Sequence, residues 1–135
     1  MKQVIFIILL ILSSGPTYAE WAAVGENVDL DTIYVDIETI RRKGELAEVW
    51  VMTDSKIAKR FLGTNSFYVS VRQLQQFNCG EERSRILNAT WFSSNMGKGT
   101  VIDTLTKEGQ WNPLPPGSVG RRLMEVICRK LSPSG

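Results

Sequence analysis

The sequence predicts an α+β fold, an antiparallel β-sheet of about six strands with one C-terminal helix packed on one face and stapled by a disulfide. Several segments alternate apolar and polar residues, a pattern typical of half-buried strands. One segment near the C-terminus instead has apolar residues at helical spacing. A sheet and a single amphipathic helix can bury their apolar faces against each other as two layers.

A first hairpin is predicted early in the chain. Residues 32–40 alternate between two faces, with Ile33, Val35 and Ile37 on one and Tyr34, Asp36 and Glu38 on the other. A basic turn ends at Gly44, where a positive φ is expected, and residues 46–53 form the second strand.

A long strand and a second hairpin are predicted farther along. Residues 67–79 form an extended run whose apolar face holds Phe67, Val69, Val71, Phe77 and Cys79. Gln73 and Gln75 interrupt this face, which predicts a bulge or an exposed strand end. Residues 82–94 and 100–106 are also strand-like, and the glycines of residues 97–99 separate them, so these two segments form the second hairpin.

The C-terminal segment predicts a rigid connector followed by a helix. Residues 111–117 contain three prolines, which exclude a helix or a central strand. Ser118 is a good N-cap, and the helix that follows places four apolar residues at helical spacing: Val119, Leu123, Val126 and Ile127. Arg129 and Lys130 lie where the helix dipole favours cations.

Residues 1–19 are predicted to be an export signal. Nine consecutive apolar residues, Val4 to Leu12, follow a short positive start, whereas a bilayer-spanning helix needs about 20. Small residues at Thr17 and Ala19 predict cleavage after Ala19, which leaves residues 20–135 as a single domain with no integral membrane span. No cysteine lies near this site for lipid attachment. We therefore expect an exported protein, periplasmic or secreted, with the cell surface as a further location.

Cys79 and Cys128 are the only cysteines of the chain. An even count in an exported protein is normally disulfide-bonded, and within one monomer only one pairing exists. A redox pair or a zinc site fits less well, because the two cysteines are far apart and the chain has no histidine. We predict a structural disulfide that staples the C-terminal helix to the strand ending at Cys79.

The composition excludes several classes of function. The chain has 16 Lys and Arg against 14 Asp and Glu, so no nucleic-acid partner is expected. The absence of histidine removes the common nucleophilic triads and the histidine-ligated metal sites. We therefore predict a non-enzymatic protein with no catalytic residue, no cofactor and no metal.

Two motifs suggest chemistry only weakly. Asp36 and Glu38 share a strand face, as the carboxylates of a glycosidase might, but alternation alone produces such pairs on any solvated strand. Residues 97–100 resemble a fragment of a phosphate loop, yet Ser93 and Gly99 stand where the motif requires glycine and a hydroxyl residue. A turn between two strands accounts for these glycines.

Arginine and aromatic residues indicate a surface for a protein partner. Tyr68, Arg72, Arg83, Arg85 and Trp91 can form a basic and aromatic patch on the outer face of the sheet, of the kind that dominates protein interfaces. The alternative is an ordinary solvated face compensated by nearby acidic residues. An open sheet also leaves unpaired edges, so a homodimer formed by edge pairing is a further expectation.

Short motifs along nearly the whole mature chain resemble a known family. They are Trp21, Ile33-Tyr34-Val35-Asp36 with Ile40-Arg41, Val49-Trp50-Val51, Ser70-Val71-Arg72-Gln73 with Asn78-Cys79, Met96-Gly97-Lys98-Gly99, Trp111-Asn112-Pro113 and Val126-Ile127-Cys128. Together they resemble the surface-adhesin protein E family of Gram-negative bacteria.

The resemblance implies a sheet of about six strands with a C-terminal helix held to its concave face by the disulfide of Cys79 and Cys128. It also implies binding of host extracellular-matrix and serum proteins, such as vitronectin and laminin. By the same resemblance, the segment Ser70, Val71, Arg72 and Gln73 is part of what members present to a partner.

Two hypotheses for function follow. The first is an exported, non-catalytic binding module that recognises another protein, either a host extracellular-matrix protein or an envelope partner. The second is a soluble periplasmic envelope protein of the same fold with a structural or small-molecule-binding role. A third hypothesis, a hydrolase that uses Asp36 and Glu38, depends only on the shared strand face of these two carboxylates.

Overall fold

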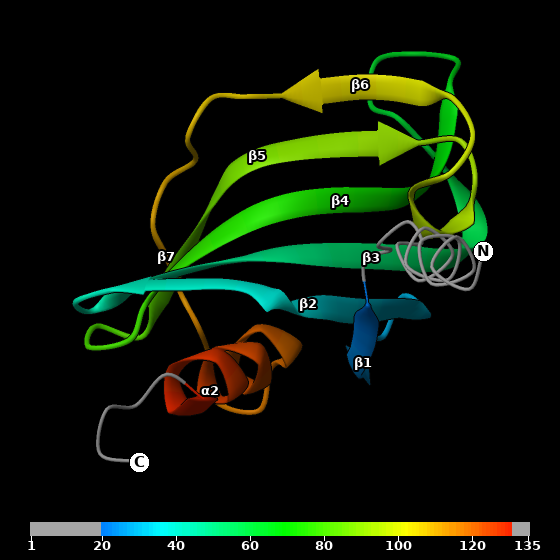
Figure 1. Cartoon of the computed structure of the whole chain (residues 1–135). Coiled ribbons are helices and arrows are strands. Elements are labelled where there is room, and N and C mark those ends of the chain that lie inside the picture. Colours follow the sequence, from blue (N-terminus) through cyan, green and yellow to red (C-terminus); the bar gives the residue numbers. More distant parts are fainter. Residues whose placement is uncertain (1–19, 131–135) are drawn as a thin grey trace, which may run out of the picture.

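The computed structural model describes residues 20–130, so the predicted export signal lies outside the described residues. Within them the chain forms one antiparallel sheet whose strands follow chain order from β1 to β6, with β7 added beside β5, and the helix α2 (Figure 1). The elements are β1 (Trp21–Glu26), β2 (Asp31–Lys43), β3 (Leu46–Arg60), β4 (Phe67–Asn78), β5 (Arg83–Phe92), the short 3₁₀ turn η1 (Asn95–Gly97), β6 (Val101–Leu105), β7 (Asn112–Pro113) and α2 (Val119–Lys130). The predicted fold class is confirmed.

The sheet contains strand segments that the sequence did not predict. β1 has little polar alternation, and its extended form comes from antiparallel pairing with β2, as between Trp21 and Asp36. β3 continues beyond the predicted end at residue 53, because Lys59 and Arg60 pair with the start of β4. β7 lies in the proline-rich connector and pairs with β5 through Pro113 and Asn112, at the edge position where a missing N–H donor is tolerated.

Irregular pairing bends the long strands. In β2 the register with β3 shifts between Asp36 and Arg41, so residues 37–40 bulge out of the ladder. The Thr39 hydroxyl fixes this bulge, since it donates to the Asp36 carbonyl at 2.7 Å and accepts from the Trp50 amide at 3.1 Å. The bulge predicted near the glutamines of β4 also exists, between Leu74 and Gln75, but β5 supplies the extra residue.

The core lies between α2 and one face of the central strands. Figure 1 shows the helix beside the β1–β3 half of the sheet. The buried cluster combines Val35, Ala47, Val49, Val51 and Phe77 from the sheet with Leu123, Met124 and Ile127 from α2. The alternation along β2 is the one that the sequence predicts, and the pairing of β3 with β2 extends it to Val49 and Val51.

Helix α2 begins as predicted but turns a different face to the sheet. The Ser118 hydroxyl accepts a hydrogen bond from the Arg121 amide at 3.1 Å, which confirms the N-cap. Met124 is buried, whereas Val126, expected on the apolar stripe, is 39% exposed. The rotation places Leu123, Met124 and Ile127 over the strands, because these three line up on one side of the helix.

A disulfide joins Cys79, directly after β4, to Cys128 in the last turn of α2, with 5.9 Å between their Cα atoms. The predicted pairing is confirmed. Arg42 adds a second tie between sheet and helix, since its guanidinium donates to the Cys128 carbonyl at 3.1 Å. The helix is therefore attached to the sheet both covalently and through hydrogen bonding.

The opposite face of the sheet is partly covered by the loop around η1. Ser70 is fully buried there, and its hydroxyl donates to the Ser94 carbonyl at 2.6 Å and accepts from the Gly97 amide at 2.9 Å. Gly97 has a φ of 71°, and a Cβ atom on it would come within 2.9 Å of the Met52 side chain. Gly97 therefore allows the tight connection between β5 and β6, in the turn that the sequence predicts.

Loss of the disulfide should lower the stability of the domain. Cys79→Ser combined with Cys128→Ser is expected to reduce the free energy of unfolding by about 2–4 kcal/mol, because the bond removes entropy from the unfolded chain. Urea unfolding with and without reductant measures the effect. The double variant is the control, since reductant should not change its midpoint. An equal midpoint for reduced and oxidised native protein would contradict the prediction.

Candidate functional site

Side chains that point away from α2 gather on the other side of the sheet. We call this side the open face and define it by Asp36 of β2, Trp50 of β3, and Arg72 and Phe92 of β4 and β5. Asp36 pairs directly with Trp50, and Arg72 pairs with Met52. Because neighbouring residues of a strand face opposite sides, burial of Val35 and Val51 under the helix turns Asp36 and Trp50 outward.

Arg72 lies against two aromatic rings of the open face. Its guanidinium carbon is 5.5 Å from the centroid of the Trp50 ring and 5.3 Å from that of Phe92. Both distances are within the range of cation–π attraction. In the described part of the chain no ion pair engages this guanidinium. The rings thus hold an exposed charge in place and leave its N–H donors available.

A pocket of about 280 Å³ opens beside Arg72 and is lined by Trp21, Asp36, Thr39, Trp50 and Arg72. Asp36 is only 7% exposed. Trp21 reaches the pocket because β1 pairs with β2 opposite Asp36. The pocket therefore combines two indole walls with one carboxylate and one guanidinium.

The structure separates the residues of the predicted basic and aromatic patch. Arg83 pairs with Asn78, and Arg85 pairs with Gln76, so both arginines lie on the same side of β5. Arg85 is held in place, because it donates to Gln76 at 2.7 Å, lies 4.6 Å from the Trp111 ring centroid and pairs with Glu108 at 3.3 Å. Arg83 is exposed.

Ser70 and Gln73 of the segment implied by the resemblance, and Tyr68 and Trp91 of the patch, lie away from Arg72 on the open face. Ser70 is buried beneath the η1 loop, so its side chain is not on the surface. Gln73 pairs with Val51 and so faces the helix side, where it accepts a hydrogen bond from Gln75 at 2.7 Å. Tyr68 and Trp91 both contact Phe61, at centroid distances of 6.4 and 5.1 Å, at the end of the sheet near the β3–β4 connection.

The carboxylate pair considered for hydrolysis does not share a regular strand face. Asp36 is buried, whereas Glu38 is exposed within the bulge of residues 37–40. The bulge interrupts the alternation on which the pairing was predicted. Among the described residues, no group of three acidic, cysteine or histidine side chains is placed to hold a metal ion.

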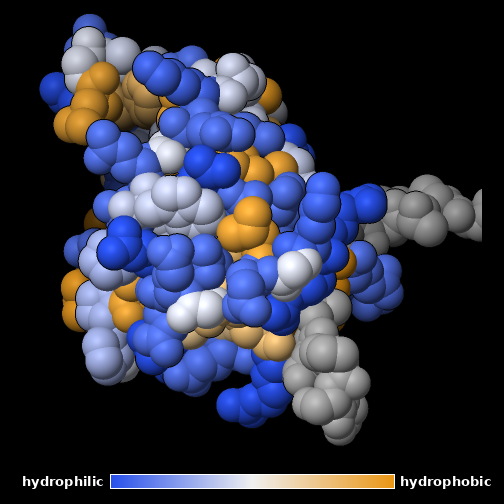
Figure 2. All heavy atoms as spheres, turned by 90° about the vertical axis from the view of Figure 1, so that its left-hand side faces the viewer, coloured by the Kyte–Doolittle hydropathy of each residue, from blue (hydrophilic) through white to orange (hydrophobic). Residues whose placement is uncertain are grey.

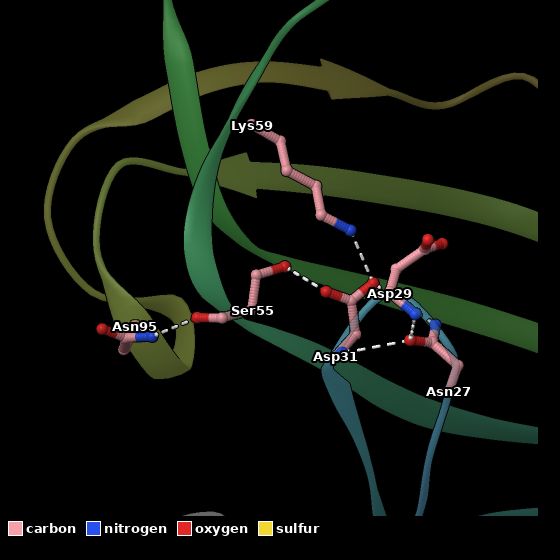
Figure 3. A network of polar contacts seen from close by, with 6 residues as sticks. All are labelled: Asn27, Asp29, Asp31, Ser55, Lys59 and Asn95. Carbon is pink, nitrogen blue, oxygen red and sulfur yellow. Dashed lines mark hydrogen bonds and ion pairs between the residues drawn. The ribbon is translucent and has the colours of Figure 1, made fainter.

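A second polar cluster fixes the connection between β1 and β2 (Figure 3). The Asp31 carboxylate, 4% exposed, accepts from the Ser55 hydroxyl and the Lys59 ammonium, both at 2.6 Å. The Asn27 side chain accepts from the backbone amides of Asp29 and Asp31, both at 3.0 Å. The cluster therefore anchors the loop to β3 at one end of the sheet.

Burial and hydrogen bonding act in opposite directions on the pKa of Asp31. Burial raises it, but hydrogen bonds from Lys59, Ser55 and Asn27, with the positive charge of Lys59, lower it below its ordinary value. The hydrogen bond to Asp31 raises the pKa of Lys59 in return. Both groups are therefore charged near neutral pH, and their ion pair stabilises this end of the sheet.

One end of the molecule has few broad apolar areas on its surface. Figure 2 views the end of the molecule where the β2–β3 and β4–β5 connections lie, and that side is mainly hydrophilic with small, separate apolar areas. Large apolar side chains are exposed elsewhere, among them Val28 at 96% in the loop anchored by Asp31 and Leu62 at 92% in the β3–β4 connection. No helix among residues 20–130 is long and apolar enough to cross a membrane.

A family model described as surface-adhesin protein E matches residues 21–129. The chain belongs to this family. The sequence resemblance is thus confirmed, and an adhesin-like module is the coarse function that membership supports. No curated protein sequence matches the chain significantly.

Solved structures of Haemophilus influenzae protein E share the fold. One crystal form aligns with a TM-score of 0.66 at 16% identity over 85% of this chain and 91% of that chain. The selenomethionine form aligns with a TM-score of 0.65 at 15% identity, over 90% and 97% of the two chains. Protein E from a non-typeable strain aligns with a TM-score of 0.61 at 16% identity, over 84% and 78%. At such identities the likeness concerns the fold.

Replacing Asp31 should weaken the domain in a pH-dependent way. At pH 7, Asp31→Asn is expected to lower the free energy of unfolding by about 2 kcal/mol, because Lys59 loses its charged partner. Because the pKa of Asp31 is lower in the folded state, its charged carboxylate contributes fully to the free energy of unfolding above a pH of about 4. This contribution is lost as the pH falls through the folded-state pKa of Asp31. Urea unfolding of the native protein and of Asp31→Asn should therefore show that the difference between their free energies of unfolding becomes smaller from pH 7 to pH 3.

Asp29→Asn is the matched control, since Asp29 belongs to the same loop but is exposed. It should change stability by less than about 0.5 kcal/mol. A difference between native protein and Asp31→Asn that stayed constant down to pH 3 would contradict the role assigned to the ion pair.

Proposed function

We propose that the protein is an exported, non-catalytic binding module that recognises another protein through the open face. Membership of the surface-adhesin protein E family supports this function. The single observation that carries it is Arg72, an exposed arginine held by the rings of Trp50 and Phe92. Arginine and aromatic residues contribute most of the energy at many protein interfaces.

The position of Arg72 favours an acidic group on the partner. A guanidinium binds a carboxylate through two parallel N–H donors, and this planar arrangement adds direction as well as strength. The two rings restrict the side chain before binding, so less conformational entropy is lost when a partner is bound. The proposed partner is a host extracellular-matrix protein such as vitronectin or laminin, or an envelope protein with an exposed acidic residue.

The second candidate function is a soluble periplasmic protein of the same fold that binds a small molecule. The pocket of about 280 Å³ beside Arg72 favours it, because the pocket is concave and combines apolar walls with two charged groups. This function and protein recognition use neighbouring parts of one face.

Arg72 should contribute strongly to binding of a protein partner. In solid-phase binding to purified vitronectin and laminin, Arg72→Ala is expected to weaken the affinity at least tenfold, since it removes a pre-positioned charge. Arg72→Lys should recover little, because an ammonium lacks the planar fork of donors. Arg129→Ala is the matched control, since Arg129 is an exposed arginine of α2 and lies outside the open face and the predicted patch. Equal affinities of native protein and Arg72→Ala, with native melting behaviour in both, would exclude this role.

Export predicts a processed N-terminus. Mass spectrometry of the protein recovered from cells that express the full chain should give a mature form beginning at Glu20. Recovery of the intact leader would contradict cleavage after Ala19. Protease treatment of intact cells, with a permeabilised control, then separates the two classes of partner. Digestion of intact cells favours a host protein, and digestion only after permeabilisation favours an envelope protein.

A homodimer formed by edge pairing stays a prediction. β6 is the candidate edge, since it pairs only with β5 within the described sheet and exposes Val101 and Leu105 at 52% and 44%.

A further inference from the structure

Two opposite charges face the same pocket of the open face without pairing. Asp36 and Arg72 both line it. In the described part of the chain, the ion pairs are formed by Lys56, Lys59, Arg85 and Arg121 with acidic residues, and none joins Asp36 to Arg72. Asp36 is 7% exposed as a whole residue, and no described side chain forms an ion pair with its carboxylate, so a cation that enters the pocket would bind the carboxylate favourably.

The sheet keeps the two charges apart. Asp36 lies on β2 and Arg72 on β4, with β3 and Trp50 between them. Two strand spacings, together with an offset of two residues along the strands, place their Cα atoms about 12 Å apart. The guanidinium cannot approach Asp36 freely, because Trp50 and Phe92 hold it at 5.5 and 5.3 Å from their ring centroids. A ligand that carries both a cation and an anion can contact the two groups at once.

The remaining lining residues restrict the ligand further. Thr39 already donates to the Asp36 carbonyl and accepts from the Trp50 amide, so its hydroxyl has no second proton to donate. Polar recognition therefore depends on Asp36 and Arg72. Trp21 and Trp50 supply apolar walls, which favour a ligand with an apolar side chain.

We propose that this pocket binds a free α-amino acid with an apolar side chain. The ammonium group of the ligand donates hydrogen bonds to the Asp36 carboxylate, and its carboxylate accepts from the Arg72 guanidinium. The apolar side chain packs against the indole rings of Trp21 and Trp50. This site rests on the small-molecule-binding role given above as the second candidate function and names its ligand class. It is separate from recognition of a protein partner, because the ligand needs no second macromolecule.

Titration with L-leucine tests the site. The probe is added to the ¹⁵N-labelled protein, and the indole N–H signals of Trp21 and Trp50 are followed by NMR. Trp21→Phe and Trp50→Phe assign these signals. We expect both signals to shift in a saturable way. Two analogues each remove one charge: 3-methylbutylamine lacks the carboxylate, and 4-methylpentanoate lacks the ammonium. Each should bind at least tenfold more weakly, because one charge-assisted hydrogen bond is lost.

Matched variants test the two protein charges. Asp36→Asn and Arg72→Gln are each expected to weaken leucine binding at least tenfold. Glu38→Gln and Arg83→Gln are the controls, since they remove the same charges from exposed positions outside the pocket. The controls should bind leucine like the native protein. Thermal unfolding of every variant shows that a loss of binding is not a loss of fold.

Three outcomes would overturn the proposal. The first is the absence of saturable shifts up to leucine concentrations of about 10 mM, because a dissociation constant above that value is too weak for specific recognition. The second is binding of either single-charge analogue as tightly as leucine. The third is unchanged leucine binding in Asp36→Asn or Arg72→Gln. The titration uses no protein partner, so its failure is separate from any failure of vitronectin or laminin binding.

Discussion

The structure depends on burial of one face of the central strands beneath α2. The alternating residues Val35, Val49 and Val51 fill this core with Phe77 and the apolar side of the helix. The disulfide between Cys79 and Cys128 holds the helix against the strands. Because side chains alternate across a strand, this single packing arrangement also decides which residues point outward. The open face is therefore a direct consequence of how the core is buried.

Departures from regular pairing make the open face more than a solvated sheet surface. The bulge of residues 37–40 is fixed by Thr39, and it leaves Asp36 in a pocket rather than in an exposed row of carboxylates. Pairing of β1 with β2 brings Trp21 to the same pocket. At the far end of the sheet, the Asp31 cluster anchors the β1–β2 loop to β3 and so keeps the edge strand in place.

The placement of Arg72 connects the fold with the proposed function. An arginine on a solvated strand would be mobile, and ordering it on binding would cost conformational entropy. Here the rings of Trp50 and Phe92 limit that mobility, while the guanidinium stays exposed. Of the two rings, Trp50 on β3 also lies between Asp36 on β2 and Arg72 on β4, so both charges remain available to ligands. Protein recognition and binding of a small zwitterion are thus both compatible with one arrangement of side chains.

The sequence by itself determined the fold class, the pairing of Cys79 with Cys128, the Ser118 cap and the inward face of β2. These features follow from local periodicity, from capping chemistry and from the presence of only two cysteines. The sequence also indicated Arg72 but grouped it with Ser70 and Gln73, which the structure places in a buried and a helix-facing position. Only the tertiary structure decided that Trp21, Asp36, Trp50 and Arg72 meet in one pocket. These residues come from four different strands, and their meeting depends on cross-strand register and on bulges, which local sequence patterns do not encode.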